Sequence, residues 1–205
     1  MATIYDLKPR FQALLRPVCG ALARAGVTAN QVTVAAALLS AAGGGVILWQ
    51  PEARWPLLAL PVVLFLRMAL NAIDGMLARE HDMKSRLGAV LNELGDVVAD
   101  MALYLPLAAV PGITPWLVAG LVMVGILVEM TGVVGVQIGA SRRYDGPVGK
   151  SDRAFVFGLL AFLLGIGVGA GIWIDILLML ALALSGFTTI NRARGALAEA
   201  AGGDK

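Results

Sequence analysis

The chain alternates between long apolar runs and short segments rich in basic and polar residues. Six apolar runs approach the roughly 20 residues that an α-helix needs to cross a bilayer. They cover approximately residues 32–49, 56–78, 87–109, 115–139, 154–172 and 173–191. The pattern predicts an all-α polytopic membrane protein with six transmembrane helices.

The amino-terminal segment has a different pattern, because apolar residues between positions 4 and 24 are interspersed with basic ones. This spacing predicts an amphipathic helix that lies in the membrane interface. Thr28 is expected to cap the first transmembrane helix. The predicted organisation is an interfacial helix over residues 1–27, a six-helix domain over 28–195 and a flexible tail over 196–205.

Composition agrees with a membrane protein. Hydrophobic residues make up 59% of the 205 residues, charged residues make up 15%, and the mean hydropathy is +0.81. A soluble domain needs more polar surface than this. The single cysteine, Cys19, has no partner for an intrachain disulfide and is interpreted as a small packed residue.

Basic residues gather on one side of the expected spans. The loops and termini on that side contain Lys8, Arg10, Arg16, Arg24, Arg79, Lys84, Arg86, Arg142, Arg143, Lys150, Arg153, Arg192, Arg194 and Lys205, whereas the opposite loops contain only Arg54. By the positive-inside rule, both termini and these loops face the cytoplasm. The net charge of +2 is therefore mainly a topology signal, and we expect the protein in the cytoplasmic membrane and not on nucleic acid.

Carboxylates and amides interrupt the apolar pattern between residues 71 and 100. Two sets follow helical spacing: Asn71, Asp74, Gly75 and Ala78, and then Gly88, Asn92, Asp96 and Asp100. Each set lines one side of its helix, so two polar stripes can face each other across a cleft. Oxygen ligands suit Mg²⁺ or Mn²⁺, and ionisable groups at membrane depth indicate a functional site.

Written as a pattern, this segment is N-x2-D-G-x2-A-R-x8-G-x3-N-x3-D. It closely resembles the signature of the CDP-alcohol phosphotransferases, D-x2-D-G-x2-A-R-x8-G-x3-D-x3-D. Asn71 and Asn92 replace the first and third aspartates. Residues 28–33 resemble the family opening TPN-x2-T, with Ala29 in place of proline. Because the family's four carboxylates surround a pair of metal ions, the two amides leave open whether one or two ions bind here.

The resemblance implies a reaction and a role for each matching residue. An acceptor hydroxyl attacks the β-phosphorus of the CDP-alcohol, and CMP leaves. The implied metal ligands are Asn71, Asp74, Asn92 and Asp96, and Asp96 is also the implied general base. The implied nucleotide site consists of Thr33, Gly75, Ala78, Arg79 and Gly88.

Two acids near the signature have open roles. Glu93 is a candidate metal ligand in place of Asn92, and Asp100 is a candidate support for the metal site. The alternative for both is a buried polar side chain paired with another helix through Arg67 or Glu129. His81 is interpreted as a solvated loop residue.

A second basic cluster lies between residues 141 and 153. Its members, Arg142, Arg143, Lys150 and Arg153, are candidate ligands for a phosphate on the acceptor. Topology alone also explains them, and both interpretations stay open. The expected reaction is phosphatidyl transfer from CDP-diacylglycerol in phospholipid biosynthesis, with glycerol 3-phosphate as the first candidate acceptor and inositol phosphate or serine as others. Membrane lipids are the expected partners, and a second copy of the chain is a candidate partner, with helix packing within one chain as the alternative interpretation of its glycines.

Two other functions are compatible with the same residues. A non-catalytic relative would retain nucleotide or lipid binding, with Asn71 and Asn92 marking the loss of metal chemistry. A transporter would use intramembrane carboxylates in an ion pathway, but these carboxylates gather near one end of two adjacent spans.

Overall fold

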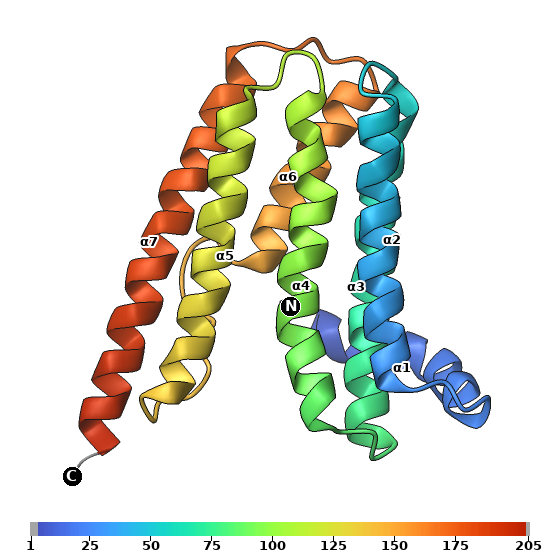
Figure 1. Ribbon diagram of the computed structural model, residues 1–205, viewed down its shortest axis with the longest axis vertical. Helices are drawn as coiled ribbons and strands as arrows, with labels where there is room; N and C mark the ends of the chain where they lie inside the picture. Colours follow the sequence, from blue (N-terminus) through green and yellow to red (C-terminus); the bar gives the residue numbers. More distant parts are fainter. Residues whose placement is uncertain (1–3, 204–205) are drawn as a thin grey trace.

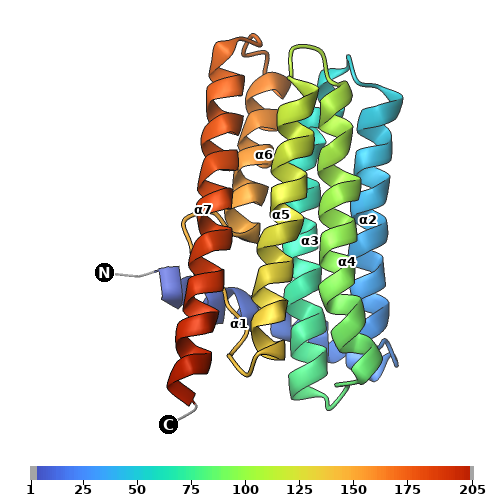
Figure 2. The same ribbon diagram turned by 60° about the vertical axis from the view of Figure 1, so that its left-hand side comes forward.

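The computed structural model describes residues 4–203, which form seven α-helices and one short 3-10 helix (Figure 1). They are α1 (Ile4–Arg24), α2 (Ala29–Trp49), α3 (Arg54–Glu80), α4 (Arg86–Tyr104), η1 (Leu105–Ala109), α5 (Pro115–Gln137), α6 (Lys150–Gly165) and α7 (Ile172–Gly203). Helices α2 to α7 run alongside one another, and α1 lies across one end of the bundle (Figures 1 and 2). The all-α, polytopic prediction is confirmed.

Four helices, α2, α3, α5 and α7, are long and apolar enough to cross a membrane. Six spans were predicted, but α4 carries Glu93, Asp96 and Asp100, and α6 has only 16 residues. The apolar run predicted a span to residue 172, but α6 ends at Gly165, and Gly167 just beyond it has a φ of +97°. Both helices nevertheless lie within the bundle beside the four candidate spans (Figure 2).

Each helix from α2 through α7, together with η1, contributes side chains to the main apolar core, which includes Leu103, Leu117 and Leu178. Tyr104 stacks on Phe157 with ring centroids 4.4 Å apart. At the start of α2, the backbone N–H of Gln31 donates a hydrogen bond to Thr28 Oγ1, and the backbone N–H of Thr28 donates one to Gln31 Oε1. The predicted cap is therefore confirmed, and it is a reciprocal capping box.

Helix α1 packs against the same end of the bundle as the α3–α4 turn. Cys19 is fully buried there beside Val32 and Met76, and its burial raises the pKa of the thiol. Arg16 donates two hydrogen bonds to the Glu80 carboxylate, at 3.1 and 3.0 Å. This forked pair attaches α1 to the last turn of α3.

The connection from α5 to α6 folds back along the bundle instead of extending away from it. The Arg143 N–H donates to the Gly132 carbonyl at 3.3 Å, and the Val148 N–H donates to Thr188 Oγ1 at 3.0 Å. Gly146 has a φ of +123°, and a Cβ there would lie 2.5 Å from the Thr188 methyl carbon. The connection consequently starts α6 inside the bundle, part way along α5 and α7 (Figure 1).

The last helix continues to Gly203, although the sequence predicted a flexible tail from residue 196. Ala196 is buried, and Glu199 accepts hydrogen bonds from Ser141 and Arg143. These contacts with the α5–α6 connection give the carboxyl-terminal turns of α7 a partner that composition does not reveal.

Candidate active site

The two polar stripes predicted on α3 and α4 do face each other. Asn71 Nδ2 on α3 donates a hydrogen bond to Asp96 Oδ1 on α4 at 3.2 Å. Arg67, one turn earlier on α3, donates to the Asp96 carbonyl at 3.1 Å and to Asp100 Oδ1 at 2.5 Å. Helix α2 packs against both α3 and α4 and closes the back of the cleft.

Asp74 lies on the α2 side of this cleft and is 6% exposed. Thr33 Oγ1 on α2 donates to Asp74 Oδ2 at 2.8 Å. The same hydroxyl lies 3.1 Å from the carbonyl oxygen of Ala29, one turn earlier in α2. Thr33 therefore connects the start of α2 to the carboxylate that the sequence assigned as the firmest metal ligand.

A cavity of about 400 Å³ opens between α2, α3 and α4. All five predicted nucleotide residues line it, together with Asp74 and Asn92; the full lining is Ala29, Asn30, Thr33, Asp74, Gly75, Ala78, Arg79, Met83, Lys84, Ser85, Gly88, Ala89 and Asn92. A Cβ on Gly88 would lie 2.7 Å from Asn30 Oδ1. Sequence reasoning missed Asn30, although it lies within the matched TAN-x2-T segment.

A second, mostly apolar cavity of about 600 Å³ lies along α3 and α6. Its polar lining includes Arg67, Asn71 and Lys150, and its apolar lining includes Pro61, Leu64, Phe65, Met68, Phe155, Leu159 and Phe162. Asn71 lines this groove and Asp74 lines the nucleotide-side cavity, one helical turn apart on α3. The two cavities therefore lie on either side of the signature residues.

Several of the implied metal ligands contact other side chains. Asp96 is already in contact with the Asn71 amide, with Lys150, and with Arg67 at 3.6 Å. Within residues 4–203, no group of three or more histidine, cysteine, aspartate or glutamate side chains is arranged to hold a metal ion. Asp74 and Asn92 line the cavity between α2, α3 and α4, and Asn71 contacts Asp96 through its amide nitrogen, which leaves its amide oxygen for other partners.

Glu93, the alternative metal ligand, is engaged elsewhere. Its Oε2 accepts a hydrogen bond from Arg142 Nη2 at 2.5 Å. Asp100 pairs with Arg67, which is the helix-to-helix pairing weighed for it from the sequence. His81 ends α3 as its carboxyl-terminal cap residue.

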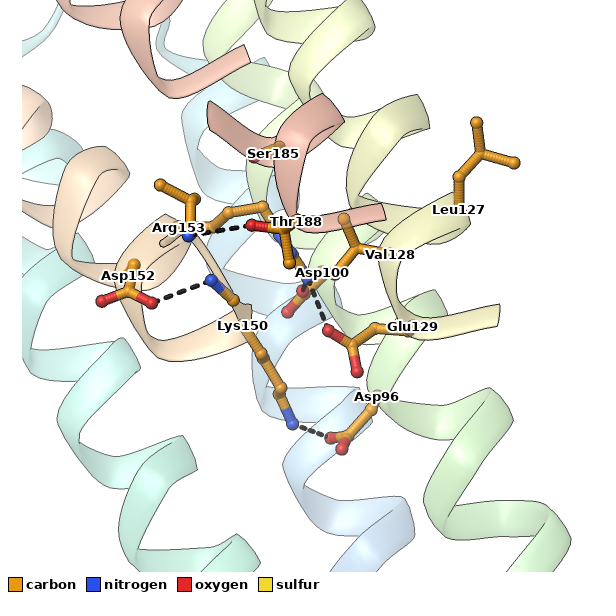
Figure 3. Close-up of polar contacts among 12 residues, drawn as sticks. Asp96, Asp100, Leu127, Val128, Glu129, Lys150, Asp152, Arg153, Ser185 and Thr188 are labelled. Carbon is orange, nitrogen blue, oxygen red and sulfur yellow. Dashed lines mark hydrogen bonds and ion pairs between the residues drawn. The ribbon is translucent and has the colours of Figure 1, made fainter. Parts of the chain in front are cut away.

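The four candidate acceptor ligands do not form a free anion site. Arg153 is 2% exposed and donates to Glu129 at 3.2 Å, and Lys150 contacts Asp96 (Figure 3). Arg142 pairs with Glu93. Arg143 bonds Asp145 and Glu199, each at 2.7 Å, and these hydrogen bonds raise its pKa.

Glu129 on α5 is the centre of this ion-pair cluster. Its carboxylate lies 3.5 Å from Arg142, 3.2 Å from Arg153 and 3.5 Å from Arg192. Sequence reasoning noted Glu129 only as a possible partner for the signature acids and did not single out Arg192. The available signal was one acid inside an otherwise apolar span, but its partners come from three separate segments.

Comparison with known proteins identifies relatives of the chain. A family model described as CDP-alcohol phosphatidyltransferase matches residues 26–190. The inner membrane protein YnbA of Escherichia coli strain K12 is 45% identical over 195 residues, which cover 95% of this chain and 96% of that protein.

Solved structures show a similar fold. Phosphatidylinositol phosphate synthase PgsA1 of Mycobacterium tuberculosis with CDP-DAG bound gives a TM-score of 0.75 at 20% identity, covering 88% of this chain and 92% of that one. The same enzyme in complex with manganese and citrate gives a TM-score of 0.75 at 20% identity and covers 88% of each chain. At this identity the similarity is one of fold.

Proposed function

The chain belongs to the CDP-alcohol phosphatidyltransferase family, and from this premise we propose that it transfers a phosphatidyl group from CDP-diacylglycerol to a polar alcohol with release of CMP. The observation that carries the proposal is the pair of cavities that flank Asn71 and Asp74. Seven of the thirteen residues that line the first cavity are polar, whereas most residues that line the second, along α3 and α6, are apolar. A nucleotide joined to a lipid likewise has a polar part and an apolar part.

In this proposal the cytidine occupies the cavity between α2, α3 and α4, and the acyl chains occupy the groove along α3 and α6. The diphosphate lies between them, beside Asn71 and Asp74. Gly88 leaves space for the base, since a Cβ there would displace Asn30. Arg79, which lines the nucleotide-side cavity, offers a guanidinium fork to the diphosphate.

The transfer forms one bond and breaks one. The acceptor hydroxyl oxygen forms a bond to the β-phosphorus, and the bond from that phosphorus to the CMP oxygen breaks with its electron pair leaving on CMP. Asp96 takes the hydroxyl proton as general base. Asn71 orients the Asp96 carboxylate through its 3.2 Å hydrogen bond, and the acceptor hydroxyl replaces Lys150 at the carboxylate.

Asp74, with the amide oxygens of Asn71 and Asn92, would hold one divalent cation, Mg²⁺ or Mn²⁺. When bound, such an ion would supply neutralising charge for the diphosphate. The protein's own residues position CDP-diacylglycerol between the two cavities and hold the Asp96 carboxylate that acts as the general base.

We further propose that α4 and α6 cross the membrane with the four candidate spans, and that the cleft faces the cytoplasm. The α3–α4 turn, the start of the α5–α6 connection and the carboxyl-terminal turns of α7 lie at the same end of the bundle as α1 (Figures 1 and 2). These segments carry the basic residues that the positive-inside rule places in the cytoplasm.

The test is CMP release from CDP-diacylglycerol by the protein in nanodiscs, with Mg²⁺ or Mn²⁺ and a panel of alcohols. We expect acceptor-dependent release that Asp96→Asn lowers by about 100-fold or more, because the base is lost while the side-chain shape is kept. Asp82→Asn, in the exposed α3–α4 turn, is the matched control.

Full activity of Asp96→Asn would remove Asp96 from its role. No release with any alcohol, from a protein that still binds CDP-diacylglycerol, would favour the non-catalytic relative. The non-catalytic function is a second candidate because Asn71 and Asn92 replace two aspartates of the family signature.

A further inference from the structure

A network of ion pairs surrounds the acceptor side of the cleft. The connected network contains five cations and four carboxylates: Arg67, Arg142, Lys150, Arg153 and Arg192 with Glu93, Asp96, Asp100 and Glu129. They come from α3, α4, α5, α6, α7 and the α5–α6 connection. We refer to these residues as the ion-pair cluster.

The cluster has an inner part and an outer part. Arg67, Arg153 and Arg192 have side chains that are 5% exposed or less, and Asp100 and Glu129 reach only 12% and 11%. Four side chains at the cleft are more accessible, between 22% and 33% exposed: Glu93, Asp96, Arg142 and Lys150. A ligand entering from the cleft therefore meets two carboxylates and two cations.

Arg153 retains one guanidinium nitrogen, Nη1, that is buried without a hydrogen-bond partner. The cavity beside it measures about 10 Å³ and is lined by Asp100, Tyr104 and Glu129 among others. This volume corresponds to about one water molecule and excludes a phosphate group. The unpaired nitrogen consequently provides no phosphate site.

A phosphate monoester carries close to two negative charges at neutral pH. At Arg142 or Lys150 a phosphate competes with Glu93 or Asp96, and that carboxylate stays near the phosphate as a like charge. Removing one partner of a partly desolvated ion pair is costly for the same reason. An uncharged or zwitterionic alcohol can hydrogen-bond to the same groups without separating the pairs.

We propose that the acceptor is a polar alcohol without a phosphate group, and that Glu93 enforces this choice by neutralising Arg142. The inference rests on the proposed transferase function and replaces glycerol 3-phosphate, the acceptor first expected from the sequence. Glu93 acts as a specificity residue, since its carboxylate accepts a 2.5 Å hydrogen bond from Arg142 Nη2, whereas Arg142 Nε is buried.

The experiment compares phosphate-free and phosphorylated acceptors in the CMP-release assay. Glycerol, myo-inositol and L-serine form one set, and glycerol 3-phosphate and inositol 1-phosphate form the other. The wild-type protein should use at least one member of the first set with a kcat/KM about tenfold or more above that of any member of the second, a margin that corresponds to about 1.4 kcal/mol.

Glu93→Gln should shift the ratio of kcat/KM values toward the phosphorylated acceptors, because it leaves Arg142 with a surplus positive charge. Glu80→Gln is the matched control, since it removes a carboxylate from the Arg16 pair outside the cluster. Inorganic phosphate gives a second readout: it should inhibit CMP release more strongly in Glu93→Gln than in the wild type or Glu80→Gln.

Preferential use of glycerol 3-phosphate or inositol 1-phosphate by the wild type would overturn this inference and leave the transferase function intact. Equal phosphate inhibition of Glu93→Gln and Glu80→Gln would overturn the role of Glu93. No CMP release with either set would overturn the transferase function, and this inference with it.

Discussion

The nucleotide-side cavity and the ion-pair cluster share helix α4 but use their polar residues differently. Around the cavity, Asp74 has one hydroxyl partner from Thr33, and Asn92 and Arg79 face open space. In the cluster, most charged side chains contact an opposite charge from another helix, and Glu129 contacts three. One region leaves its donors and acceptors to a ligand, whereas the other satisfies them internally.

This difference indicates that the polar residues of the nucleotide-side cavity serve ligand binding, whereas those of the ion-pair cluster hold the helices together. Buried ion pairs add little net stability compared with apolar packing, but breaking one leaves an uncompensated charge. The cluster therefore fixes how α4, α5, α6 and α7 meet, and a change there should reduce stability first. A change around the nucleotide-side cavity should reduce turnover first.

The largest effect on turnover is expected from Asp74→Asn. The amide keeps the shape of the side chain and can still accept the Thr33 hydrogen bond, but it removes the carboxylate that we propose lies beside the diphosphate. CMP release should fall at least about 100-fold, with no loss of thermal stability. A parallel loss of stability would show that Asp74 is an architectural residue like those of the cluster.

Glu129→Gln should mainly lower thermal stability, in contrast to Asp74→Asn, which should mainly lower turnover. It leaves Arg142, Arg153 and Arg192 without their shared carboxylate. Removing one partner of a buried pair costs about 3–5 kcal/mol, so the Tm in detergent should fall by at least about 5 °C. Glu52→Gln, in the exposed α2–α3 turn, is the control. An unchanged Tm would contradict the architectural role.

The double variant Asn71→Asp with Asn92→Asp sharpens the account of the metal site. Two restored carboxylates should lower the Mg²⁺ or Mn²⁺ concentration for half-maximal CMP release by about tenfold, because ligand charge sets affinity for hard cations. Each single variant shows which position dominates. An unchanged metal requirement would indicate that another group, such as Glu93, already supplies the charge.

Gly88→Ala should have the smallest effect. The new Cβ would lie 2.7 Å from Asn30 Oδ1 and 3.0 Å from Ser85 Oγ, so the Asn30 side chain must move within the cavity. We expect the KM for CDP-diacylglycerol to rise about fivefold at nearly unchanged kcat. Gly95→Ala, on the same helix, meets only a Thr33 methyl carbon at 3.7 Å and should behave as wild type. Equal KM values for both variants would argue against a nucleotide at Gly88.

Local periodicity was sufficient to predict the helices and the two polar stripes. Asn71 and Asp96 face each other because each lies on a regular helical face of an α3–α4 hairpin. The five nucleotide-site residues surround one cavity for the same reason, with Thr33 brought in by the capped start of α2. Their role as a nucleotide site stays a prediction.

The ion pairs could not be predicted in the same way, since they depend on tertiary packing. Arg142 and Arg153 were candidate phosphate ligands, with topology as the alternative, but the folded-back α5–α6 connection brings them against Glu93 and Glu129. The ends of α6 and α7 also differ from the predicted spans, which ended at residues 172 and 191, because they depend on backbone conformation and tertiary contacts. Gly167 ends one helix by its backbone conformation, and contacts with Ser141 and Arg143 extend the other.

The placement of these partners along the chain also affects how the protein is made. Arg142 lies 49 residues after Glu93, and Lys150 and Arg153, the partners of Asp96 and Asp100, come later still. When α4 leaves the ribosome, only Arg67 on α3 is available to its acids, and a lone carboxylate at the centre of a bilayer costs about 3 kcal/mol. We therefore expect α4 to remain at the translocon or the membrane surface until α5 and α6 have been synthesised.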